Sequence, residues 1–153
     1  MPTVHVSDKS NLPPDQVLAS ARDFSERRAK LWPDVHTEHF TVHETGETWA
    51  EVTEGNPWPG MGIVWERLRY DWSQPGWVKG TVIDSNLFKA GSTWEISAQP
   101  DGNGSLVEVI AVRHLAGRGR LIAPVFPLGL AKRTVADHLR HFLHEVEAGE
   151  TSR

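Results

Sequence analysis

Three polar residues stand out because strand alternation would point them into the interior of a sheet: Glu66, Tyr70 and Arg113. Burial raises the pKa of a carboxyl group, so an inward Glu66 could act as a general acid or base. A guanidinium at the same wall could polarise a ligand carbonyl or bind a carboxylate. We therefore treat these three side chains as candidate catalytic residues.

The same residues also have simpler interpretations. Glu66 and Arg113 could pair only with each other as a structural ion pair, or a bulge could turn both to water. The strand register has two options as well, because the opposite face holds Ile63 and Trp65 together with three charged residues. We favour the face that carries Glu66 inward, because its other members are apolar or aromatic: Val64, Leu68, Tyr70 and Trp72.

Eight histidines raise the possibility of a metal site. In the predicted strand over residues 35–44, only His39 and His43 share a face, and they would lie about 13 Å apart, too far to bind one ion. Three more histidines drift around the polar side of the predicted last helix without a recognised metal motif: His138, His141 and His144. We expect no metal and no cofactor.

Several connecting segments carry residues that could contact a ligand. Trp58 and Phe88 lie in connections otherwise made of Gly, Pro, Asn and Ser, and Trp32 lies in a third connection at the same expected edge. We interpret these aromatic residues as a candidate cavity entrance, the alternative being that they pack under the loops. Residues 117–120, Gly-Arg-Gly-Arg, could bind an anion or form a solvated turn.

The composition excludes several classes of protein. The chain of 153 residues has a net charge of −4, so it lacks the basic face that nucleic-acid binding requires. It has no cysteine, and no catalytic triad spacing, phosphate-binding loop or dinucleotide motif is present. No window approaches the length of a membrane span, and the first ten residues do not resemble a secretory signal. We expect a cytoplasmic protein without integral membrane association, of undetermined oligomeric state.

The hydrophobic pattern changes period twice along the chain. Residues 3–7 alternate as a short strand, residues 11–32 contain two short helical stretches, and Pro33 ends the second. Period-two segments separated by turn-rich connections then predict six strands, over residues 35–44, 48–54, 62–72, 77–85, 92–99 and 106–114. The pattern over about residues 124–148 predicts an amphipathic helix whose apolar stripe is Leu128, Ala131, Val135, Leu139, Phe142 and Val146.

This order of elements predicts one α+β domain over residues 1–153, with an ordered core over about 3–149. A long amphipathic helix must bury its apolar stripe, and the sheet is the only large surface available to it. A seven-stranded antiparallel sheet twists and curls, so a helix laid across its concave side leaves space between the two. The predicted architecture is a helix-grip fold with an internal cavity.

Several tryptophan and turn motifs lie along this layout: Leu-Trp-Pro at 31–33, Thr-Gly at 45–46, Val-Trp-Glu-Arg-Leu at 64–68, Gln-Pro at 74–75, Ser-Thr-Trp-Glu-Ile at 92–96 and Asp-Gly-Asn-Gly-Ser at 101–105. In these features the chain resembles the START-like or Bet v 1-like superfamily, and within it the bacterial polyketide cyclase/dehydrase-type branch. The resemblance implies a helix-grip fold whose cavity holds a lipid, sterol, polyketide or aromatic product. It implies no particular reaction, since many relatives only bind and carry.

The main functional prediction is binding or carrying of a hydrophobic small molecule between the sheet and the last helix. The predicted ligand-binding residues are Val64, Leu68, Tyr70, Trp94, Ile96, Val109, Arg113, Leu128, Val135 and Leu139. A second hypothesis is a cyclase or dehydratase acting on a polyketide-like substrate, for which two of the polar candidates should meet inside the cavity. A third is a protein-interaction module that uses Trp49, Trp65 and Trp77 on the outer sheet face.

Overall fold

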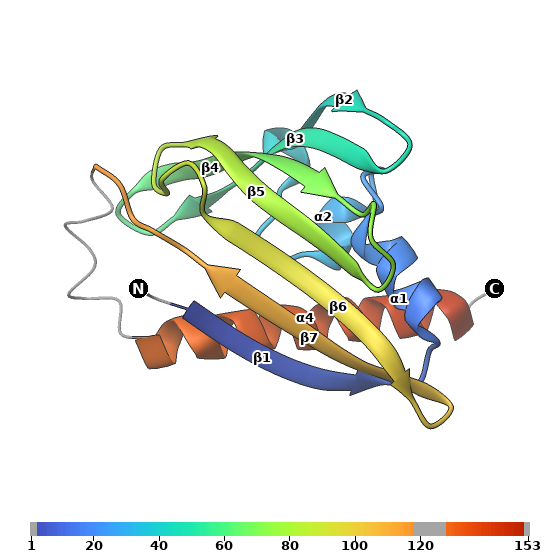
Figure 1. The fold of residues 1–153 in the computed structure, drawn as a ribbon. Coiled ribbons are helices and arrows are strands. Elements are labelled where there is room, and N and C mark those ends of the chain that lie inside the picture. The colour runs from blue at the N-terminus through green and yellow to red at the C-terminus, as the bar shows by residue number, and fades with distance from the viewer. Residues whose placement is uncertain (1–2, 118–127, 152–153) are drawn as a thin grey trace.

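The computed structural model describes residues 3–117 and 128–151, and within these residues it has the predicted α+β helix-grip fold. Seven strands form one antiparallel sheet in the order β1-β7-β6-β5-β4-β3-β2 (Figure 1). The strands are β1 (Thr3–Ser10), β2 (Thr41–Thr45), β3 (Trp49–Trp58), β4 (Gly62–Asp71), β5 (Trp77–Ser85), β6 (Thr93–Asp101) and β7 (Gly104–Val112). The helices are α1 (Pro14–Ala21), α2 (Arg28–Leu31), the 3-10 turn η1 (Thr37–His39) and α4 (Leu128–Thr151).

Helices α1 and α2 confirm the two short helices predicted after the first strand. Pro14 occupies the first helical position of α1, where a missing N–H costs nothing. The buried face of α1 consists of Val17, Leu18 and Ala21, and it packs against β6. Helix α2 ends at Leu31, two residues before Pro33.

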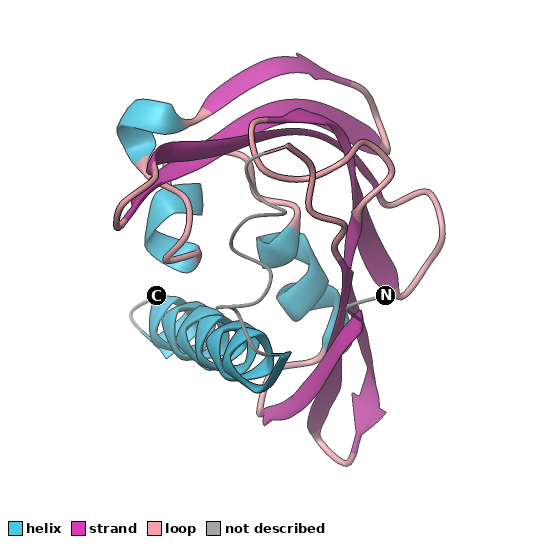
Figure 2. Ribbon diagram, turned by 90° about the vertical axis from the view of Figure 1, so that its left-hand side faces the viewer, coloured by secondary structure: helices cyan, strands magenta, loops and turns pink. Residues whose placement is uncertain are grey.

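The sheet arches around helix α4, which is seen nearly end-on in Figure 2. The pairing of β4 with β5 shifts by one residue, so that Arg67 faces Asp84 and Leu68 faces Val82. The skipped residue is Ile83, whose side chain is exposed. A bulge of this kind increases the local twist and bends a sheet, which helps β4 and β5 to curl over the interior.

Helix α4 buries the apolar stripe that its periodicity predicts. Leu139, Phe142 and Val146 lie in the core, and Ala131 and Val135 are partly buried against it. The helix continues to Thr151, beyond the predicted end, and the predicted start at residue 124 lies outside the described residues. None of the helices in the described ranges is both long and apolar enough to cross a membrane.

The first strand, predicted over residues 3–7, continues to Ser10, and two later strands differ further from their predicted bounds. The segment over residues 35–44 is not one strand, because residues 37–39 turn as a 3-10 helix and β2 begins only at Thr41. His39 therefore lies in a helical turn, so the strand spacing used for His39 and His43 does not apply. The next strand, predicted to end at residue 54, continues to Trp58 because the hairpin turn uses Gly60 and Gly62, both with positive φ.

Candidate functional site

A cavity of about 550 Å³ lies between the concave side of the sheet and helix α4. Strands β1, β3, β4, β6 and β7, the segment after α2 and one side of α4 all contribute to its walls. Most of the described lining is apolar or aromatic, as the alternation of buried residues along each strand requires. Its apolar lining includes Val4, Val64, Trp94, Val109, Ala111 and Leu139.

Seven of the ten predicted ligand-binding residues line this cavity: Val64, Tyr70, Trp94, Val109, Arg113, Val135 and Leu139. Leu68 and Ile96 do not line it, and both are fully buried in the core at 1% and 0% exposure. Both residues belong to the hydrophobic core cluster, and β6, the strand that carries Ile96, packs against α1. Leu128 begins α4, but its side chain is outside the described part of the structure.

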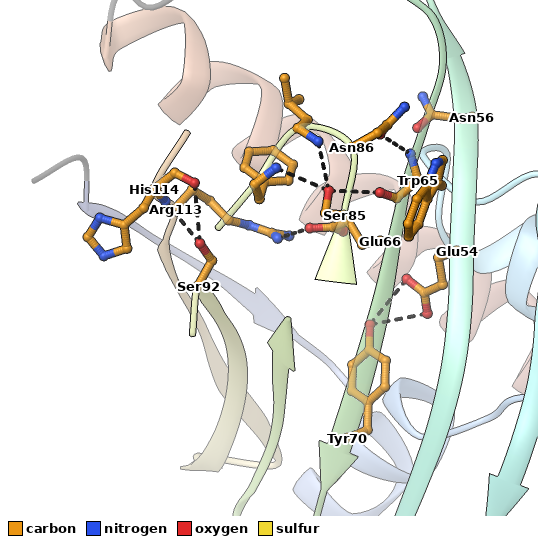
Figure 3. Close-up of polar contacts among 12 residues, drawn as sticks. Glu54, Asn56, Trp65, Glu66, Tyr70, Ser85, Asn86, Ser92, Arg113 and His114 are labelled. Carbon is orange, nitrogen blue, oxygen red and sulfur yellow. Dashed lines mark hydrogen bonds and ion pairs between the residues drawn. The ribbon is translucent and has the colours of Figure 1, made fainter. Parts of the chain in front are cut away.

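Glu66 and Arg113 meet at the cavity wall, where the Arg113 guanidinium donates a hydrogen bond to the Glu66 carboxylate (Figure 3). Strand β4 presents Glu66 on the same face as Val64 and Tyr70, which confirms the favoured register. The side chains of Glu66 and Arg113 are 13% and 23% exposed. The Arg113 guanidinium also lies 4.8 Å from the centre of the Phe88 ring. The structure therefore shows the ion pair that the sequence analysis gave as the first alternative to a catalytic role for Glu66 and Arg113.

Burial raises the pKa of the Glu66 carboxyl group, and the nearby positive charge of Arg113 offsets this increase only in part. Two further carboxylates, Glu54 and Asp34, raise the same pKa. Glu66 is therefore harder to ionise than an exposed glutamic acid, which is the property that a buried general acid needs.

The raised pKa of Glu66 predicts how stability depends on pH. The folded protein binds this proton more tightly than the unfolded chain, so the stabilisation is complete below the ordinary pKa of glutamic acid. It is lost as the pH rises through the raised pKa. Urea denaturation measures the free energy of unfolding of wild type and of Glu66→Gln at each pH. The value for wild type minus the value for Glu66→Gln should decrease as the pH rises through the raised pKa. If wild type instead gains stability relative to Glu66→Gln as the pH rises, the positive charge of Arg113 affects the pKa of Glu66 more strongly than burial does.

A second polar group, formed by Arg28, Glu54 and Tyr70, lies deeper in the same cavity. Arg28 Nε donates to the Glu54 carboxylate at 2.9 Å, and Arg28 Nη1 donates to the backbone oxygen of Ala21 at 2.7 Å. The Tyr70 hydroxyl lies 3.1 Å from both Glu54 oxygens (Figure 3). Burial, followed by the neighbouring Glu54 charge, raises the pKa of Tyr70 well above its ordinary value. Tyr70 therefore remains a neutral hydrogen-bond donor to Glu54.

Of this group, Tyr70 was predicted from the sequence, whereas Glu54 and Arg28 were not. A usable signal existed for Glu54, because it shares its strand face with Ala50 and Val52, both buried. The turn was expected to begin at Gly55, which hid that alternation. Helix α2 has only four residues, too few for a periodic pattern that would reveal Arg28 as buried.

Of the three predicted entrance residues, two are half-buried at the cavity wall and one is buried in the interior. Phe88 and Trp58 are half-buried and line the cavity, Trp58 as the last residue of β3 and not within a loop. Trp32 is 5% exposed, and its ring stacks on Phe142 with the ring centres 4.3 Å apart. It is thus an interior wall residue, because this stacking removes its ring from the surface.

His138 lines the cavity, although the sequence analysis placed it on the polar side of the last helix. Its position is three residues after Val135 and four before Phe142, which keeps it next to the buried stripe. His138 Nδ1 lies 4.0 Å from a carboxylate oxygen of Asp34, another lining residue.

Three residues of the predicted anion-binding loop, 118–120, lie outside the described residues.

Comparisons with solved structures place this arrangement within a known fold. A protein of Thermus thermophilus, TTHA0849, is 16% identical with a TM-score of 0.79, over 97% of this chain and 99% of that one. The Zhui aromatase/cyclase of a Streptomyces species is 19% identical with a TM-score of 0.69, over 95% and 93%. A START superfamily protein of Mycobacterium smegmatis is 12% identical with a TM-score of 0.70, over 97% and 95%.

These likenesses define a START-like, Bet v 1-like fold. Residues 1–148 match the family described as polyketide cyclase / dehydrase and lipid transport, and the chain belongs to that family. The match confirms the resemblance inferred from the tryptophan and turn motifs. A comparison with curated protein sequences gives no match.

Proposed function

We propose that this protein binds or carries a hydrophobic small molecule in the cavity between the sheet and α4. The observation that carries the proposal is the cavity itself, whose volume of about 550 Å³ falls in the range typical of small-molecule sites. Its apolar walls would bury most of a ligand, and a few polar groups at fixed positions would orient it. The family description, which includes lipid transport, supports the same function.

Native mass spectrometry of the protein purified from its own host tests the proposal. A bound apolar molecule at one copy per chain is the expected result, and its extraction would identify the ligand class. The neutral fluorophore N-phenyl-1-naphthylamine provides an independent readout, because its emission rises when it enters an apolar site. A protein that carries no molecule and gives no saturable fluorescence increase would contradict the proposal.

Catalysis on a polyketide-like substrate is a second candidate, favoured by one observation. Two of the three candidate residues, Glu66 and Arg113, meet within hydrogen-bond reach inside the cavity. Tyr70 forms its hydrogen bonds with Glu54 in the same cavity, so proton-transfer groups are present. Both carboxylates are engaged by protein partners, however, and a general base must be free to reach a substrate proton. This engagement favours binding over catalysis.

A protein-interaction surface on the outer face of the sheet has less support. Trp49, Trp65 and Trp77 are each half-buried, and the Arg69 guanidinium lies 4.2 Å from the centre of the Trp49 ring. That hypothesis requires a large exposed apolar patch together with a filled interior. The interior contains a cavity instead.

A further inference from the structure

The carboxylates of the cavity outnumber its guanidinium groups, and both guanidinium groups are already paired. Among the described lining residues there are three carboxylates, Asp34, Glu54 and Glu66, but only two guanidinium groups, Arg28 and Arg113. Each guanidinium donates to a carboxylate of the protein: Arg28 to Glu54 at 2.9 Å, and Arg113 to Glu66. Both positive charges are therefore neutralised before any ligand enters.

This pairing makes the binding of a negatively charged ligand unfavourable. A ligand carboxylate would have to displace Glu66 from Arg113, or lie unpaired near three protein carboxylates. Placing like charges close together at a buried contact is strongly unfavourable. Glu54 and Asp34 both raise the pKa of Glu66, so their negative charges act on Glu66 within the cavity.

One neutral group in the wall lacks a hydrogen-bond partner. Trp32 lines the cavity, and its indole Nε1 is buried with no acceptor in the described part of the chain. A buried N–H without an acceptor is costly, so most such groups in proteins are paired. The nitrogen has almost no accessible surface, so a ligand oxygen could reach it only if the wall shifted.

From these observations we infer that the cavity selects an apolar molecule with a neutral hydroxyl group over one with a carboxylate. A hydroxyl can donate to Glu54 or Glu66 without disturbing either ion pair, and it adds no negative charge that these carboxylates would repel. The inference rests on the ligand-binding function proposed above, and it specifies the ligand class for the same site.

Decanol and decanoate form a matched pair of probes, because they have the same chain and differ in the head group. Each is titrated near neutral pH against the protein loaded with N-phenyl-1-naphthylamine, and the affinity ratio is read from displacement of the fluorophore. We expect decanol to bind at least about tenfold more tightly than decanoate. A neutral alcohol enters any apolar site more easily than an anion, so the decisive readout is how substitutions change this ratio.

Glu66→Gln frees Arg113 for a ligand carboxylate, and the preference for decanol should fall by about tenfold or reverse. Arg113→Met has the opposite effect, because it leaves Glu66 in place and should increase the preference. Glu51→Gln is the matched control, since Glu51 pairs with Arg67 on the outer face of the same sheet and its loss removes the same charge. The control should keep the wild-type ratio.

The possible outcomes separate this inference from the function on which it rests. Equal binding of the two probes by wild type, or an unchanged ratio in both Glu66→Gln and Arg113→Met, would overturn the hydroxyl preference while leaving ligand binding intact. Failure of the fluorophore itself to bind wild type would contradict the proposed function instead.

Discussion

Replacing Ala131 with Trp should nearly abolish binding of N-phenyl-1-naphthylamine while leaving the protein folded. Ala131 lies on the cavity side of α4 and is only half-buried, so a larger side chain can extend into open space. An indole in that space would block roughly 100 Å² of apolar contact with a ligand. At about 25 cal/mol per Å², the loss is about 2.5 kcal/mol, or about a 70-fold weaker Kd.

Lys132→Trp is the matched control for this variant. Lys132 is the next residue along α4 and lies on its exposed face, so the same side chain is added to the same helix outside the cavity. Fluorescence titration of both variants provides the measurement, and circular dichroism checks that both remain folded. Equal binding by Ala131→Trp and wild type would show that the fluorophore occupies another place.

Loss of Arg28 should produce the largest change in stability. In Arg28→Met, the Glu54 carboxylate loses its charged partner while it remains buried, with a side-chain exposure of 9%. Removing one member of a buried ion pair typically costs about 3–5 kcal/mol, because the other charge stays uncompensated. Chemical denaturation should show this loss in the free energy of unfolding.

Two further variants identify the cause of that loss. Arg28→Met combined with Glu54→Gln removes both charges and should recover much of the stability, since the amide oxygen of the new side chain would still accept from the Tyr70 hydroxyl. Arg27→Met, at the neighbouring residue, removes an exposed pair with Asp23 and should cost less than about 1 kcal/mol. A double variant as unstable as Arg28→Met alone would assign the loss to packing against Phe24 and Tyr70.

The fold could be predicted from the sequence because its determinants are local. Turn residues mark most strand ends, and a single apolar stripe defines α4. The boundaries failed where a turn signal was ambiguous: Gly55 lies within β3, while Gly60 and Gly62 form the actual turn. The sequence alone does not reveal which of these glycines has a positive φ and therefore forms the turn.

The candidate site could be predicted only in part, because alternation reveals which face a residue occupies but not how deep it lies along the strand. Val64 and Leu68 share a face of β4, yet Val64 lines the cavity and Leu68 is buried in the core. The pairing of Glu66 with Arg113 was one of the alternatives considered from the sequence, but the charged partner of Glu54 could not be predicted. Arg28 reaches Glu54 across 26 residues of chain, and no local pattern encodes such a contact.

The position of β1 in the sheet has a consequence for biosynthesis. Strand β1 pairs with β7, so contacts such as that between His5 and Glu108 join residues 103 positions apart. Helix α4, late in the chain, supplies the remaining wall of the cavity. Pairings between distant segments form slowly, since a long loop must close first. During most of its synthesis the chain therefore lacks both the partner of β1 and the helical wall, and the cavity is complete only after α4 has been made.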